Sequence, residues 1–139
     1  MNAEATVYRG GCLCGALRYV ATGEPSFGGL CYCADCRKAS GAGFIPFMGF
    51  PRERVRFTGP SSRFESISRR GGPAVRNACP ICSSLVFGGE RDSDDSHTVY
   101  AGTLDAPAAF RPTIAIFTEG RPDWAVIPEG LTIFDAGPG

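Results

Sequence analysis

The cysteines constrain the fold of this chain more than any other feature. There are seven in 139 residues. They form a C-x-C group, a C-x-C-x-x-C group and a C-x-x-C group: Cys12 and Cys14; Cys31, Cys33 and Cys36; Cys79 and Cys82. Each short spacing gathers sulfur atoms on one tight turn, as a tetrahedral Zn²⁺ with bonds of about 2.3 Å requires. Because the number is odd, complete disulfide pairing would leave one thiol over, so the pattern favours metal binding.

The number seven also suggests how the cysteines divide. A closed structural zinc site takes four, and three are left for a catalytic site with an open fourth position. We therefore assign a structural zinc to the two distant pairs (Cys12, Cys14, Cys79, Cys82) and a second, catalytic and labile zinc to the local triplet (Cys31, Cys33, Cys36). Spacing alone leaves two alternatives open: an iron–sulfur cluster, and a zinc ribbon made by the pairs Cys33/Cys36 and Cys79/Cys82.

Glycine and proline divide the remaining sequence into short segments. The 19 Gly and 11 Pro are spread along the chain, and no apolar helical pattern exceeds about three turns. We predict strands over residues 16–20, 44–50, 55–58, 63–68, 85–87, 98–101, 113–117 and 131–134. Pro46 suggests that 44–50 is an edge strand or carries a bulge. The sequence predicts an all-β fold of short strands, in a single domain over 1–139 with a core of about 7–135.

Charge and hydropathy restrict the partners. Basic and acidic residues balance at 14 each, so the chain offers no excess positive charge to nucleic acid phosphates. No run of 18 apolar residues is present, and the N-terminus lacks the basic and apolar segments of a secretory signal. We expect a cytoplasmic protein with reduced thiols that binds neither nucleic acid nor membrane. Edge strands in a small β protein would also allow a dimer.

Three segments resemble one known family. Residues 10–19, 31–38 and 79–82 are similar to the glutathione-dependent formaldehyde-activating enzyme family, and centromere protein V carries a similar domain. Residues 102–105 and 121–124 look like its C-terminal landmarks. The resemblance implies a Mss4-like, or β-tent, folded sheet and the zinc division given above. It also implies a carbon–sulfur lyase reaction, the S-(hydroxymethyl)glutathione synthase activity, in which glutathione adds to formaldehyde.

The sequence departs from the family pattern at four positions. Tyr32 and Ala115 stand where the family usually or often has histidine, and Ala78 and Ser83 replace a phenylalanine and a glycine beside the last cysteine pair. The metal ligands are retained, whereas residues that shape the pocket differ. We therefore expect the family fold and zinc chemistry, with a thiol or aldehyde that can differ from glutathione and formaldehyde.

The triplet suggests a mechanism. Zinc held by three thiolates suits a soft fourth ligand, such as a small-molecule thiol, whose pKa the metal would lower. The resulting thiolate would attack an aldehyde. Arg37 and Lys38 follow Cys36 directly and could bind a carboxylate of glutathione, the alternative being a solvated charged pair.

Other candidate residues lie farther from the triplet. Arg121 and Trp124 form a second candidate wall of the glutathione-binding site, although core packing is the commoner role for a tryptophan. The only histidine, His97, follows an acidic run and is expected in an exposed loop. Proton transfer would then fall to water, a carboxylate, Tyr32 or the substrate thiol. A non-catalytic zinc-stabilised scaffold, or a carrier of thiol adducts, is the alternative function.

Overall fold

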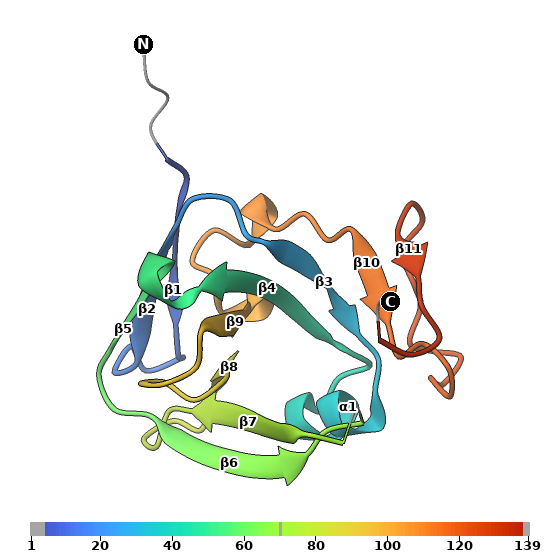
Figure 1. Cartoon of the computed structure of the whole chain (residues 1–139), viewed down its shortest axis with the longest axis horizontal. Coiled ribbons are helices and arrows are strands. Elements are labelled where there is room, and N and C mark those ends of the chain that lie inside the picture. The colour runs from blue at the N-terminus through green and yellow to red at the C-terminus, as the bar shows by residue number, and fades with distance from the viewer. Residues whose placement is uncertain (1–4, 70, 138–139) are drawn as a thin grey trace.

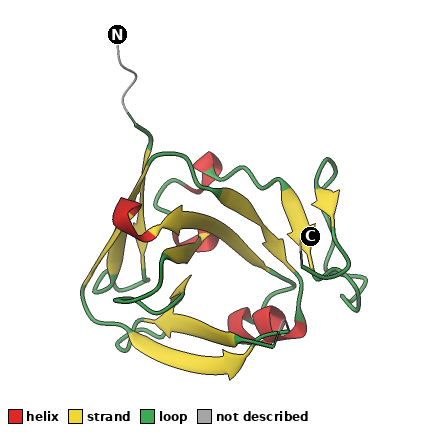
Figure 2. Cartoon of the chain, in the orientation of Figure 1, coloured by secondary structure: helices red, strands yellow, loops and turns green. Residues whose placement is uncertain are grey.

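The computed structural model describes residues 5–69 and 71–137. Figures 1 and 2 show two sheets, a three-stranded one in the order β1-β2-β5 and an eight-stranded one in the order β11-β10-β3-β4-β9-β8-β7-β6. The strands are β1 (Val7–Gly11), β2 (Arg18–Thr22), β3 (Phe27–Cys31), β4 (Ile45–Pro51), β5 (Val55–Thr58), β6 (Ser62–Ile67), β7 (Pro73–Ala78), β8 (Leu85–Gly88), β9 (Ser96–Tyr100), β10 (Ile114–Ile116) and β11 (Thr132–Ile133). Helical segments are α1 (Ala34–Ser40) and the 3₁₀ turns η1 (Arg52–Arg54), η2 (Ala101–Thr103) and η3 (Pro107–Ala109).

The large sheet is mostly antiparallel and strongly curved. Strand β10 runs parallel to its neighbours β3 and β11, and the other pairs are antiparallel. Figure 1 shows the sheet curling so that β6 and β7 come to face β3 and β4, with α1 at one end. The predicted mostly β, Mss4-like folded sheet is confirmed. The described residues form no helix with the length and apolarity needed to cross a membrane.

The main core lies between the small sheet and one face of the large one. Tyr19 of β2, Phe50 of β4 and Phe87 of β8 are buried there with at most 1% of their surface exposed. Side chains alternate along a strand, so Phe47 of β4 points to the opposite face and packs in a cluster with Cys31 and Cys36. One face of the large sheet thus builds the core, and the other is left to line a site.

Eight strands were predicted within one or two residues of their ends, and three were missed. Strand β3 contains two adjacent glycines, β7 begins with proline and carries Arg76 and Asn77, and β1 ends in two glycines. All three have low intrinsic strand propensity and are held by pairing with neighbours. Helix α1 was also missed, because at seven residues it is too short to show a helical period.

The edge-strand interpretation of Pro46 is wrong. Strand β4 is internal, with β3 on one side and β9 on the other. Pro46 pairs with Leu30 of β3, while the ladder with β9 begins at Phe47, which lies opposite Tyr100. Pro46 therefore stands outside the second ladder, where its missing N–H removes no hydrogen bond.

Candidate metal centres

The first candidate centre has four sulfur atoms, all within 4.8 Å of one another: Cys12, Cys14, Cys79 and Cys82. The sulfur of Cys14 lies 3.6 Å from that of Cys12 and 3.7 Å from that of Cys79. A tetrahedron with metal–sulfur bonds of about 2.3 Å has edges of about 3.8 Å, whereas a disulfide requires about 2.05 Å. All seven cysteines are free thiols. The spacing of the sulfur atoms fits a tetrahedral thiolate-bound metal such as zinc.

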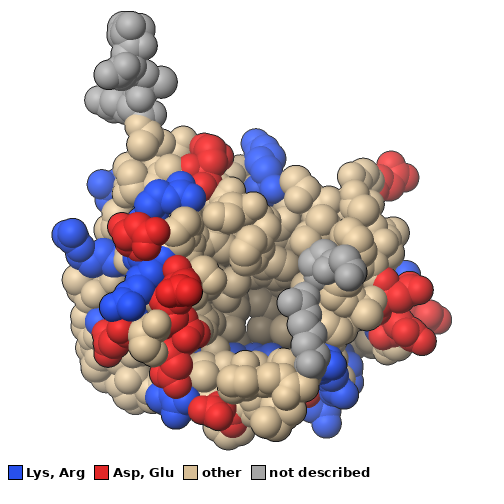
Figure 3. All heavy atoms as spheres, viewed as in Figure 1, with Lys and Arg blue, Asp and Glu red and all other residues tan. Residues whose placement is uncertain are grey.

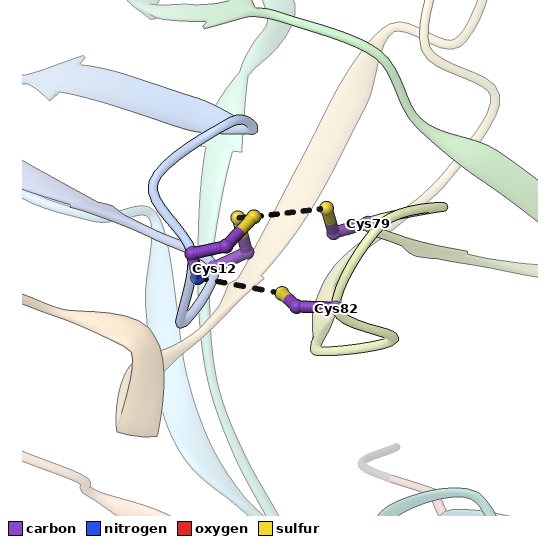
Figure 4. Close-up of side chains that lie close together, drawn as sticks. Cys12, Cys79 and Cys82 are labelled. Carbon is purple, nitrogen blue, oxygen red and sulfur yellow. Dashed lines mark hydrogen bonds between the residues drawn. The ribbon is translucent and has the colours of Figure 1, made fainter.

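Two turns from distant parts of the sequence build this centre. One connects β1 to β2 and the other connects β7 to β8, and Figure 4 shows them facing each other. Backbone N–H groups point at the sulfur atoms, with Leu17 N donating to Cys12 Sγ at 3.2 Å and Cys14 N donating to Cys82 Sγ at 3.5 Å. The Ser84 hydroxyl, 3.2 Å from Cys82 Sγ, is the main reason that the pKa of Cys82 is lowered to about 5. These donors stabilise thiolates, the form that binds metal.

The second candidate centre has three sulfur atoms within 4.8 Å of one another, those of Cys31, Cys33 and Cys36. Cys31 ends strand β3, Cys33 is the N-cap of α1, and Cys36 lies in its first turn. The Cys33 sulfur accepts a hydrogen bond from Cys36 N at 3.2 Å, as a serine or aspartate cap would. The helix ends at Gly41, whose φ of 72° only glycine adopts readily.

The three thiols strongly influence one another's ionisation. Hydrogen bonds from Cys31 and then Cys36 hold the pKa of Cys33 far below its usual range. The same interaction with Cys33 raises the pKa of Cys31. One thiolate is therefore stabilised by its two neighbours, and further ionisation is opposed. A bound cation would remove that opposition, so this donor set fits zinc as well.

The structure thus divides the cysteines four and three, as predicted from their spacing. The alternative ribbon, with Cys33 and Cys36 sharing an ion with Cys79 and Cys82, is wrong for this chain, because those pairs belong to separate clusters. The assignment of one cluster to structure and the other to catalysis remains a prediction.

The triplet opens into the large interior space of the molecule. All three cysteines line a cavity of about 790 Å³, which also borders β4, β7 and β9. Figure 3 shows the surface hollowed near the centre of the view. A cavity of this size holds a ligand as large as a small peptide.

Two cavity-lining side chains, Arg76 and Tyr100, were missed by the sequence analysis. Arg76 of β7 donates from Nη2 to Cys36 Sγ at 3.7 Å and from Nη1 to Ser66 Oγ at 3.4 Å. Burial raises the pKa of Tyr100 in β9, so its hydroxyl stays protonated. A sequence signal existed for Arg76, which precedes Cys79 by three residues, but β7 was not recognised as a strand.

The predicted carboxylate-binding residues lie elsewhere. Arg37 lines a smaller hollow of about 300 Å³ together with Cys33 and Tyr32. Lys38 is exposed on α1. Neither residue lines the large cavity, into which the triplet opens. Their role toward glutathione remains a prediction.

The second candidate wall also lies outside the large cavity. Arg121 is half-buried and donates to the backbone oxygen of Ala125 at 3.5 Å. Trp124 is 67% exposed, so the expected core packing is wrong. The chain around Trp124 forms turns and belongs to neither sheet.

The exposed-loop interpretation of His97 is wrong. The acidic turn ends before β9, and His97 is the second residue of that strand, with 2% of its surface exposed. Alternation places it on the core face, edge-on to the rings of Phe57 and Phe87 at centroid distances of 5.3 and 6.0 Å. Neither ring nitrogen makes a hydrogen bond to the described residues, and burial lowers the pKa of His97.

The departures from the family pattern have local physical correlates. Tyr32 and Ala115 belong to one apolar cluster, in which Tyr32 is 1% exposed and donates its hydroxyl proton to Val126 O at 2.8 Å. The two positions expected to hold histidine therefore pack together. Ser83, at the position of a family glycine, has a φ of 68°, a conformation that glycine adopts with less strain. Ala78 lies at an irregularity in the β7–β8 pairing.

Fold and site together define a small β protein with two thiolate clusters able to hold metal. The sequence model of the family described as glutathione-dependent formaldehyde-activating enzyme (GFA) matches residues 7–120, and the chain belongs to this family. A crystal structure of a Rhodobacter sphaeroides protein, a structural genomics target, is similar in fold, with a TM-score of 0.55 and 16% identity over 91% of this chain and 98% of that one. A search of the curated proteins finds no match.

Proposed function

We propose that this protein is a zinc-dependent enzyme of the carbon–sulfur lyase type that adds a thiol to formaldehyde or a related aldehyde. Glutathione is the thiol that family membership suggests, and the cytoplasm, where thiols stay reduced, is the proposed location. The observation that carries the proposal is the convergence of Cys31, Cys33 and Cys36 on a cavity that admits a peptide-sized molecule. A closed four-sulfur cluster offers no such access, so we assign it to structure.

The residues of the triplet would hold zinc through three thiolates. Bound there, zinc would supply a soft Lewis acid that lowers the pKa of a substrate thiol. The chain prepares this site in advance, because the N–H of Cys36 and the guanidinium of Arg76 both donate toward sulfur atoms of the triplet. These donors keep the thiolates in place and partly balance their negative charge.

Tyr100 is the group that we assign to the aldehyde. Its hydroxyl is protonated and makes no hydrogen bond to the described residues, so it is free to donate to a carbonyl oxygen in the cavity. In the reaction the substrate sulfur forms a bond to the carbonyl carbon, the π-electron pair moves to the oxygen, and the thiol proton ends on that oxygen. A hydrogen bond from Tyr100 would stabilise the developing negative charge.

The test is the rate of adduct formation from glutathione and ¹³C-formaldehyde, followed by NMR exchange spectroscopy with the zinc-loaded protein. We expect acceleration over the uncatalysed reaction, and a loss of about 100-fold in Tyr100→Phe, the scale for one such donor. Cys33→Ser is the matched control for the metal site, since serine keeps the α1 cap but removes one thiolate. Thiol binding without acceleration would instead identify a carrier of thiol adducts.

A further inference from the structure

One cation in the cavity has no carboxylate partner. Four ion pairs join described residues, and Arg76 takes part in none of them. Arg69, which also lines the cavity, is already paired with Asp35 at 3.2 Å. Burying a cation is unfavourable unless an anion compensates it. Arg76 is half-buried, and among the described residues the only group it contacts that can carry a negative charge is Cys36 Sγ, so its remaining donors are open to a carboxylate.

The donors of Arg76 are only partly used. Nη1 and Nη2 make long hydrogen bonds, of 3.4 Å to Ser66 and 3.7 Å to Cys36, and Nε is buried without a hydrogen bond to the described residues. A guanidinium has five N–H donors in a planar fork that matches a carboxylate. The Nη2–Cys36 contact also places this fork beside the sulfur cluster.

From these contacts we infer that Arg76 binds a carboxylate of the thiol substrate, so that the site selects thiols that carry a carboxylate over neutral thiols. This inference rests on the proposed function, because it requires the thiol to enter beside the triplet. It assigns to β7 the role that the sequence suggested for Arg37 and Lys38 on α1. The reason is position: Arg76 faces the cavity into which all three cysteines open, whereas Arg37 lines the smaller hollow.

The experiment compares two probes that differ in the carboxylate, 3-mercaptopropionate and 2-mercaptoethanol. Each is titrated by calorimetry into the zinc-loaded full chain, and the ratio of the two dissociation constants is the readout. We expect wild type to prefer 3-mercaptopropionate by about tenfold or more, the scale of a hydrogen-bonded charge pair. Arg76→Met should abolish the preference, and Arg76→Lys, which keeps the charge without the fork, should restore part of it.

The control is Arg56→Met, because Arg56 is an exposed arginine on β5 of the other sheet, and its ratio should equal that of wild type. Zinc content is measured for every variant. If Arg76 serves only to support Cys36, the Arg76→Met change weakens the binding of both thiols by the same factor, and the inference is overturned. A preference that is lost in Arg37→Met but kept in Arg76→Met also overturns it. Binding of neither probe to wild type would refute the proposed function itself, and the carboxylate assignment with it.

Discussion

The two cysteine clusters present the same donor atom in different surroundings. The four-sulfur cluster joins turns that are 65 residues apart between Cys14 and Cys79, and two of its members, Cys12 and Cys79, belong to the main core. The three-sulfur cluster is contained within residues 31–36 and faces a cavity. A long-range closed cluster connects elements that would otherwise separate, whereas a local cluster constrains little of the fold. We therefore predict that stability depends on the first cluster and chemistry on the second.

The largest expected effect is a difference in protein stability between variants of the two clusters. Cys79→Ser is expected to unfold the chain or to lower its free energy of unfolding by several kcal/mol, because a structural zinc contributes about 10 kcal/mol or more to folding. Cys36→Ser should lose one zinc with a much smaller change. Guanidinium unfolding followed by circular dichroism, with zinc analysis of each variant, measures both. Equal losses of stability would contradict the division.

Chelator treatment of the wild-type chain sharpens the same comparison without mutation. We expect zinc to leave in two phases, with the first equivalent coming from the triplet, which has fewer protein ligands and opens into the cavity. The folded state should persist after the first phase and be lost with the second. Release is followed with a colorimetric zinc indicator and the fold by circular dichroism. A single phase, or unfolding in the first phase, would show that the clusters are equivalent.

The smallest effect concerns the loss of stability in acid that is caused by His97, which packs against the aromatic side chains of Phe57 and Phe87. Burial lowers the pKa of His97, with Arg52 acting in the same direction and Asp94 opposing it. Below about pH 6.5, the ordinary histidine value, the unfolded chain therefore binds more protons than the folded chain. The contribution of His97 to stability is full above that pH and falls on acidification, by at most about 1.4 kcal/mol per pH unit.

Unfolding measured from pH 7.5 to 5 should give a shallower pH dependence in His97→Phe, which keeps an aromatic ring edge-on to Phe57 and Phe87. Metal release at low pH affects both proteins, so the difference in slope isolates His97. Identical slopes would mean that His97 binds protons equally in the folded and the unfolded chain, and that its burial does not influence acid stability.

Much of the site could be derived from the sequence, because metal-ligand spacing is local information. The turn at Cys12 and Cys14 and the turn at Cys79 and Cys82 each fix two sulfur atoms, and the count of seven then leaves the triplet. Other residues could not be placed in this way. His97 seemed exposed because five acidic or serine residues precede it, but one residue of register in β9 decided which face it occupies.

The sequence by itself determined the family and the mostly β fold, and it predicted the division of seven cysteines into four and three, which the structure then separated from the ribbon alternative. Only the tertiary structure decided what surrounds the triplet. Arg76 and Tyr100 come from β7 and β9, which meet the end of β3 through the curvature of the large sheet and the pairing register of its strands. Curvature and register arise from contacts between distant segments, and no local spacing of residues encodes them.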